Sequence, residues 1–322
     1  QEILQQQNAY DLASALNWAT GITVVQSASN VPGTAFYSRG FQIDQIHIDG
    51  SAPLSIGSNG TTVGDLSEYE QIELLRGADG LFGGAGSPGG TINLVRKQPL
   101  ASTEASLTTT VGSWDYYRAQ ADATGPLGLG GALRGRVVAS STDQRYSYET
   151  ANREQRKIYG ALSWDLSPSS LLTVGGSAEQ ANTTNMLNGL PRYNDGADPH
   201  LPRRFALVFP WSRDRMHTSE AFANLEQRFG KDWKLKVNLT RLQARIDNLD
   251  GSETQAGIDP VERVLGAPPM AAATSVRSQA VSLAATLTGS FDWNGRRQES
   301  MAGADYTRTS YGGDARVSAF KG

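Results

Sequence analysis

The chain has 322 residues, a formal net charge of −3 and no cysteine. The slight negative charge gives no reason to expect nucleic acid, which selects basic surfaces, and the lack of cysteine excludes disulfides and cysteine-ligated metal sites. Its 35 glycines, with recurring Thr, Ser and Asn, favour a strand-rich and turn-rich protein of two domains or one large β domain.

The first hundred residues combine short helices and short strands. Leu12, Ala15, Leu16 and Ala19 recur at helical spacing and predict a helix over 8–19, which Gly21 closes. One further helical turn is predicted over 65–69. Strands are predicted over 22–26, 41–49, 71–75 and 91–96, with a glycine-rich stretch at 77–90. This pattern predicts an α+β unit.

From about residue 103 the pattern changes to repeated strands. Val281, Leu283, Ala285 and Leu287, for example, are separated by single residues that are mostly polar, which is the period of two expected of a strand. We expect about nine antiparallel strands, near 103–112, 115–124, 132–142, 155–165, 170–180, 217–229, 233–244, 276–291 and 298–309.

Several features of these strands favour a lipid-facing barrel over a soluble sandwich. No run approaches the ~18 apolar residues of a membrane-spanning helix, but a transmembrane barrel carries its apolar surface on alternate residues. Charged residues such as Arg118 and Arg136 lie on the other face, and aromatic residues such as Trp164 and Trp233 lie near strand ends. Short and long connections also alternate, as expected for periplasmic turns and extracellular loops. Because nine strands cannot close a bacterial barrel, more strands are expected after Gly322.

Two segments of the first hundred residues resemble the plug domain of TonB-dependent siderophore receptors. They are 36–50, which begins Phe36-Tyr37-Ser38-Arg39-Gly40-Phe41, and 69–97, which includes Ser87-Pro88-Gly89-Gly90-Thr91. The loop 188–203 resembles the ferric-coprogen and ferric-pyoverdine branch of that family. The resemblance covers essentially the whole chain. It implies a mainly β protein: an α+β plug at 1–100, then the first part of a transmembrane β-barrel at 101–322, with about nine of 22 strands.

The function implied by the resemblance is import of a ferric siderophore across the bacterial outer membrane into the periplasm. Its partners would be the siderophore, outer-membrane lipid and the energy-transducing TonB–ExbB–ExbD complex, and the full-length protein would be a monomer. No cofactor is expected, because iron arrives already chelated. No nucleophile–base pair suggests an enzyme. The family's TonB box, signal peptide and first plug strand are absent from this sequence.

Seven residues are candidate contacts of the ferric siderophore. The resemblance assigns Arg39 this role, and a guanidinium can donate several bonds to the oxygens of a ferric chelate. The glycine-rich stretch would present Leu81 and Phe82 at the plug apex, where the family often has tyrosine in place of Phe82. Aromatic and arginine side chains in the longest loop could enclose a flat chelate. The full set is Arg39, Tyr37, Leu81, Phe82, Arg192, Tyr193 and Trp211.

Each motif also has a structural interpretation. Arg39 could pair with a carboxylate, and the loop aromatics could serve packing alone. The glycine-rich stretch lacks the Gly-Lys-Ser/Thr ending of a phosphate loop. His47, His200 and His217 are too few and too dispersed for a metal site. Glu68, Glu70, Glu73 and Arg76 are expected to form salt bridges that hold the plug in the barrel.

Two alternative functions remain open at this point. One is a signalling receptor, in which a further domain would precede Gln1. The other is a passive porin-like barrel, which predicts no plug.

Overall fold

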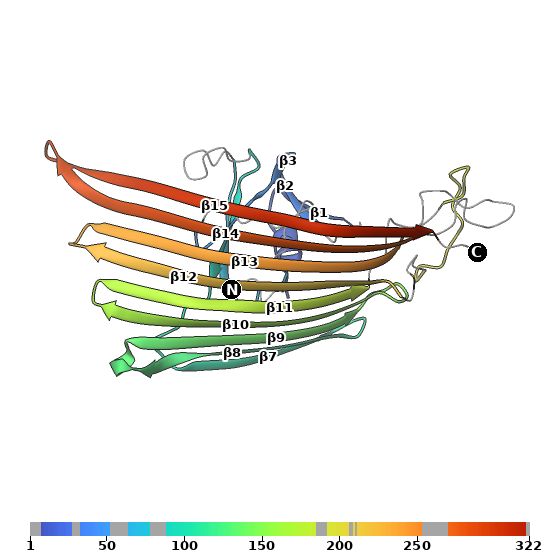
Figure 1. Cartoon of the computed structure of the whole chain (residues 1–322), viewed down its shortest axis with the longest axis horizontal. Helices are drawn as coiled ribbons and strands as arrows, with labels where there is room; N and C mark the ends of the chain where they lie inside the picture. The colour runs from blue at the N-terminus through green and yellow to red at the C-terminus, as the bar shows by residue number, and fades with distance from the viewer. Residues whose placement is uncertain are drawn as a thin grey trace.

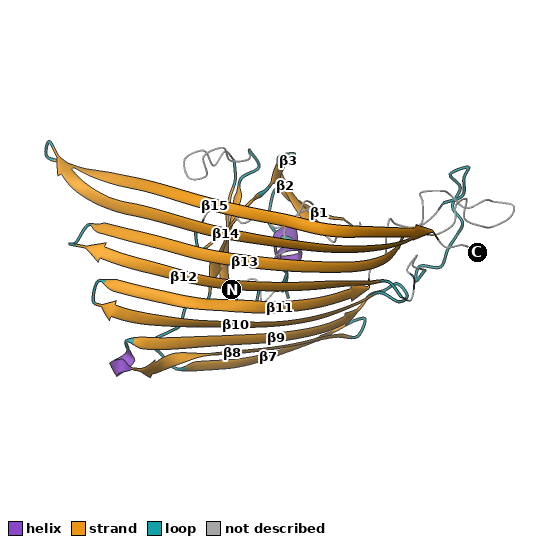
Figure 2. Ribbon diagram, viewed as in Figure 1, coloured by secondary structure: helices purple, strands orange, loops and turns teal. Residues whose placement is uncertain are grey.

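The structure is a computed structural model that describes residues 8–27, 33–51, 64–77, 88–184, 192–205, 209, 211–252 and 270–319. Most of these residues lie in β-strands, which form one large sheet and two small ones (Figures 1 and 2). No helix in these ranges is long and apolar enough to cross a membrane.

The N-terminal part, residues 8–100, holds the short helix α2 (Leu12–Asn17) and both small sheets. Asp11 caps α2, because its carboxylate accepts the Ser14 backbone N–H at 2.7 Å. In the first sheet β1 (Ile22–Ser27), β2 (Gly33–Ser38) and β3 (Phe41–Ile43) are antiparallel. In the second, β6 (Thr91–Arg96) lies between β4 (Gln45–Ile48), which is parallel to it, and β5 (Tyr69–Leu75), which is antiparallel.

The large sheet contains nine antiparallel strands in sequence order, β7 to β15, with β7 and β15 at its edges. This matches the predicted number and order of strands. Their bounds are β7 (Glu104–Gly112), β8 (Tyr116–Gly128), β9 (Leu133–Arg145), β10 (Asn152–Ser167), β11 (Ser170–Thr184), β12 (Arg213–Phe229), β13 (Trp233–Ser252), β14 (Met270–Trp293) and β15 (Arg296–Ala319), with a 3-10 turn, η1 (Leu129–Gly131), between β8 and β9.

The connections of the large sheet follow the predicted alternation. Residues 168–169, 230–232 and 294–295 are short turns at one end of the sheet, on the left in Figure 1. The longer breaks between strands, which follow Arg145 of β9, Thr184 of β11 and Ser252 of β13, fall at the other end. The mainly β class is therefore confirmed, and so is the strand pattern on which the barrel prediction depended.

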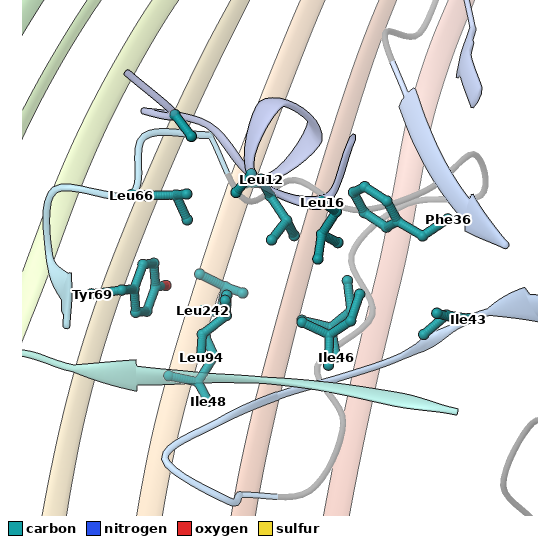
Figure 3. Packing of buried hydrophobic residues seen from close by; sticks show 14 of the residues in the cluster. Leu12, Leu16, Phe36, Ile43, Ile46, Ile48, Leu66, Tyr69, Leu94 and Leu242 are labelled. Atoms are coloured by element: carbon teal, nitrogen blue, oxygen red, sulfur yellow. The ribbon is translucent and has the colours of Figure 1, made fainter. Parts of the chain in front are cut away.

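One apolar core joins the N-terminal part to the large sheet. Leu12 and Leu16 of α2 pack in it with Phe36 of β2 and Leu94 of β6 (Figure 3). The large sheet contributes Leu242, which is 8% exposed. The side of the sheet that carries Leu242 therefore faces the N-terminal part.

Several predicted elements differ from the structure. The strand predicted over 41–49 is two strands that break at Asp44, because β3 and β4 belong to different sheets. Strand β2 was not predicted. Residues 65–69 are not helical: Asp65 forms an isolated bridge with Asp11, and a turn follows.

The strands of the large sheet also extend further toward the long loops than predicted. β13, for example, ends at Ser252 rather than at residue 244. The alternation of apolar and polar residues stops earlier, because each face of the strand mixes the two kinds there, with Ile246 beside Asn248 on one face and Asp247 beside Leu249 on the other.

Candidate functional site

Two of the predicted ligand contacts lie on the β2–β3 hairpin. Ser38 pairs with Phe41, so Arg39 and Gly40 form a two-residue turn, and both have positive φ, of 53° and 85°. Such a turn matches the twist of a hairpin, but positive φ is uncommon for arginine. Arg39 is exposed and forms no ion pair with any carboxylate in the described ranges, and Tyr37 is half-buried on β2. The guanidinium of Arg39 is thus presented to solvent.

The end of the glycine-rich stretch lies against this hairpin. A Cβ atom on Gly89 would come within 2.8 Å of the backbone oxygens of Phe41 and Gln42. Gly90 has φ +111°, and a Cβ there would lie 2.1 Å from the Leu75 oxygen. These close approaches account for glycine at both positions. Leu81 and Phe82 themselves lie outside the described residues.

The other three predicted contacts lie in the connection between β11 and β12. Arg192 is exposed, and its Nη1 donates to the Gly196 oxygen at 3.4 Å. Tyr193 is half-buried, and Trp211 stacks on Phe209 with 5.0 Å between ring centroids. Figure 1 draws this connection beyond the strand ends, whereas the β2–β3 hairpin lies nearer mid-length. The described residues show no contact between the two groups.

A second polar site, which the sequence did not predict, joins the N-terminal part to the inner face of the large sheet. At its centre is Arg96, whose side chain is fully buried. Arg96 Nη1 donates to Asp49 at 2.5 Å, and its Nη2 donates to Glu220 of β12 at 2.6 Å. The guanidinium also lies 4.2 Å from the ring centroid of Phe222. Burial alone would lower the pKa of Arg96, but the carboxylates of Glu220 and Asp49 outweigh it and raise this pKa well above its ordinary value.

Three further buried pairs connect the same two parts. Asp65 pairs with Arg118 of β8, and burial, which would raise the pKa of Asp65, is outweighed by Arg118, so this pKa is lowered. Glu68 accepts from Lys157 of β10 at 2.6 Å. Lys97 donates to Asp122 of β8 at 2.9 Å. We call the five residues on the N-terminal side the anchoring set: Asp49, Asp65, Glu68, Arg96 and Lys97.

The predicted salt-bridge set is wrong for most of its members. Of the four residues proposed, only Glu68 pairs with the large sheet. Glu73 accepts from the side chains of Gln71 and Asn93 within the N-terminal part, and Glu70 is exposed. The sequence feature that could have indicated the anchoring set is the Arg96-Lys97 dipeptide at the end of β6, combined with acidic residues on the polar face of the later strands.

The described residues contain no group of three or more His, Asp or Glu side chains that could hold a metal ion. His47 lies near the anchoring set, but its Nδ1 contacts the backbone oxygen of Ser51 at 2.5 Å.

Comparison with known proteins gives consistent matches. Residues 1–91 match the family model for the TonB-dependent receptor plug domain. The ferric-pyoverdine M114 receptor PbuA of Pseudomonas sp. strain M114 is 39% identical over 241 residues, which are 73% of this chain and 29% of that protein. The ferripyoverdine receptor of Pseudomonas aeruginosa is 33% identical over 297 residues, or 88% of this chain and 35% of that protein.

Solved structures give the same picture. The crystal structure of the ferripyoverdine receptor of the outer membrane of Pseudomonas aeruginosa, bound to ferripyoverdine, superposes with a TM-score of 0.89 at 30% identity. The match covers 97% of this chain and 42% of that one. This chain thus spans about a third of the length of the curated relatives that it matches.

Proposed function

Because the chain belongs to the family of TonB-dependent receptors, which are proteins of the bacterial outer membrane, we propose that it binds a ferric siderophore at the cell surface and takes part in its TonB-driven import into the periplasm. The observation that carries this proposal is the exposed guanidinium of Arg39, which lies on a hairpin turn within the residues that match the plug-domain family. A passive barrel without a plug does not account for the match over residues 1–91.

The proposed division of the chain is a plug at 1–100 and barrel wall at 101–322. Two arrangements support it. The two small sheets contain only strands before residue 97, and the nine-stranded sheet contains only strands after residue 103. The two parts meet through one apolar core and through the anchoring set.

The proposed ligand contacts suit a ferric chelate. A siderophore encloses iron in a shell of oxygens, and the fork of N–H groups on Arg39 can donate to several of them. Arg192 would act in the same way from the loop, while Tyr37, Tyr193 and Trp211 would provide flat apolar surfaces. Leu81 and Phe82 remain proposed contacts at the plug apex. Iron enters as part of the substrate, so the protein needs no metal ligands of its own.

Energy coupling follows from the way the plug is held. Ligand binding can shift the plug between states only by its difference in affinity for them. Inward movement of the plug must separate the buried pairs of the anchoring set, such as Arg96 with Glu220. We therefore assign that work to TonB, with ligand binding as the signal that permits it.

Replacing Arg39 by alanine in the complete receptor is expected to weaken ferric-pyoverdine binding by ~1–3 kcal/mol, the scale of a charged hydrogen bond. Quenching of tryptophan fluorescence during a titration measures the affinity. Because Arg39 has positive φ, Arg39→Asn is a second variant that suits this backbone and should weaken binding equally. Arg297→Ala, an exposed arginine paired with Asp232 in the short-turn region, is the matched control. Unchanged affinity in both Arg39 variants would remove this residue from the site.

The orientation of the wall in the membrane gives a second expected result. Leu239 lies on the outer face of β13, so an arginine there would face hydrocarbon and should cost ~2–4 kcal/mol. Gln243 lies on the same face four residues nearer the long loops, and Gln243→Arg should cost under ~1 kcal/mol. The amount of folded receptor in outer membranes, seen as the heat-modifiable band on gels, compares the two. Equal loss of folded receptor in both variants would contradict the proposed position of the hydrocarbon layer along β13, which includes Leu239 and ends near Gln243.

A further inference from the structure

Two carboxyl groups lie together on the inner face of the large sheet, near the long-loop end of β12 and β13, on the right in Figure 1. Successive side chains of a strand alternate between its faces, so Asn248 and Asp250 of β13 share the inner face with Leu242. Asp214 of β12 lies on that face too, because it is directly opposite Asn248. A hydrogen bond between their side chains joins Asp214 to Asp250.

Asn248 adds a buried amide to this pair of carboxyl groups. The exposed fractions of Asp214, Asn248 and Asp250 are 7%, 5% and 2%. Both polar atoms of the Asn248 side chain lack a hydrogen-bond partner among the described residues, as do Asp214 Oδ1 and Asp250 Oδ2. Leaving a buried polar atom without a partner is costly, so several of them side by side indicate a ligand. We call Asp214, Asn248 and Asp250 the Asp–Asn cluster.

No cation in the described ranges neutralises the Asp–Asn cluster, because neither aspartate forms an ion pair there. The neighbouring arginines of β12, Arg213 and Arg215, are exposed on the opposite face. The inward-facing Arg153 of β10 is two strands away from Asp214, which is roughly 10 Å at ~4.8 Å between strands. Two ionised carboxylates in contact repel each other strongly. The pair therefore needs either a shared proton or a bound cation.

Apolar side chains separate the cluster from the ion pairs that hold the plug. Glu220 of β12, the partner of Arg96, lies six residues from Asp214 on the same face. Between them runs a row of cross-strand partners on β11 to β14, which consists of Ala181, Met216, Ile246 and Val276. The plug cations of the anchoring set are thus screened from the cluster, which has to be neutralised locally.

The available donor atoms are all oxygens. Besides two carboxylates and the side-chain carbonyl of Asn248, the row contains the hydroxyls of Thr183 and Thr274, which lie directly opposite Asp214 and Asn248. Oxygen ligands of this kind suit a hard divalent cation, whose charge balances two carboxylates. Calcium accepts six to eight oxygens in flexible geometry, whereas magnesium keeps several of its waters. A buried set rich in protein oxygens therefore favours calcium.

We propose that the Asp–Asn cluster is a calcium site, in which Asp214, Asp250 and the carbonyl oxygen of Asn248 hold one Ca²⁺ on the inner face of the wall. The ion replaces the proton that the two carboxyl groups share, and it ties β12 to β13. Asp214 follows Trp211 by three residues, so the ion also fixes the end of the connection that carries the proposed loop contacts. The proposal is independent of which siderophore is carried.

The test uses the complete receptor, refolded in neutral detergent without lipopolysaccharide, which itself binds divalent cations. After treatment with EDTA, equilibrium dialysis against radioactive Ca²⁺ measures binding. The parent should bind the ion with a Kd of roughly 0.1–1 mM, the range of extracellular calcium modules. Asp214→Asn/Asp250→Asn should lose this ion or bind it at least about tenfold more weakly. Asn248→Asp should bind it more tightly, because affinity rises with the charge of the ligands.

The matched control is Asp232→Asn/Asp247→Asn, which removes two carboxylates that already pair with arginines and should bind Ca²⁺ like the parent. The heat-modifiable band on gels shows which variants are folded. If the double variant of the cluster does not fold, Asn248→Asp still decides, since a gain in affinity cannot come from unfolding.

Four outcomes overturn the proposal. One is a parent that binds no more Ca²⁺ than Asp214→Asn/Asp250→Asn, which would leave a shared proton as the only neutralising group. A second is Asn248→Asp that is folded but binds Ca²⁺ no more tightly than the parent. A third is equal weakening in the control, which would indicate a general effect of surface charge. The last is displacement of Ca²⁺ by an equal concentration of Mg²⁺. Siderophore import is measured separately and bears only on the proposed function.

Discussion

Replacing Arg96 by methionine is expected to weaken the attachment of the plug to the wall by about 3–5 kcal/mol, the cost of leaving buried charges without their partner. Methionine keeps an unbranched apolar stem but leaves Asp49 and Glu220 unpaired, and Glu220 is 3% exposed. Amide hydrogen exchange in the complete receptor measures the effect, because residues near β6 should exchange roughly a hundredfold faster or more.

The control for this variant is Arg134→Met. Arg134 pairs with Asp165 at 2.7 Å, but Asp165 is 43% exposed, so the loss should be under about 1 kcal/mol. A second variant adds Asp49→Asn and Glu220→Met to Arg96→Met. It should recover most of the lost protection, because replacing a whole buried charge set by neutral groups is often nearly neutral. Slow exchange in Arg96→Met itself, equal to that of the parent, would show that Arg96 does not hold the plug.

The strands of the large sheet could be predicted because each one has a single apolar face. On β14, outward Leu283 and Leu287 alternate with inward Ser282 and Thr286, and that pattern is local in the sequence. The alternation of short and long connections is equally local. These two signals were sufficient for the number, order and direction of the strands.

The N-terminal part was harder to predict because its elements depend on distant partners. Strand β4 separates from β3 because it pairs with β6, which follows it by more than forty residues. Asp65 was assigned to a helical turn, whereas its bridge to Asp11 and its pair with Arg118 set its conformation. No short window of sequence contains these interactions.

The candidate ligand site could be predicted only as separate pieces. Tyr37 and Arg39 lie on one hairpin, so their proximity follows from the local sequence. Their position relative to Tyr193 and Trp211 depends on how the plug sits against the wall, which is a long-range property. The anchoring set was missed for the same reason, since Arg96 and Glu220 are separated by 124 residues.

The composition of the plug–wall contact bears on how a plug can be both held and released. Ion pairs dominate it, and the apolar contribution from the wall consists mainly of Leu242 with the small residues Ala244 and Ala280. Buried ion pairs select one position strongly but add little net stability, because desolvation opposes their attraction. Once the plug begins to move, water can solvate the charged groups that the ion pairs release. Water would not solvate the separated surfaces of a wholly apolar contact in this way.

A disulfide between plug and wall is expected to block import while leaving ligand binding intact. Ser67 of the plug and Ser140 of β9 are both buried, and their hydroxyl oxygens are 3.3 Å apart. This separation suits the variant Ser67→Cys/Ser140→Cys, and residues 1–322 contain no cysteine of their own. In the complete receptor, the oxidised variant should bind ferric pyoverdine like the parent but import it at least about tenfold more slowly, because the plug can no longer move past β9. Dithiothreitol should restore uptake of the labelled iron complex.

The matched control is Ser163→Cys/Thr173→Cys. It joins β10 to β11, where the side-chain oxygens are 2.9 Å apart, and so links two strands of the wall without touching the plug. If uptake continues at the parental rate with the first disulfide fully formed, the plug segment around Ser67 stays in place during transport, and import must use a path that leaves this contact closed.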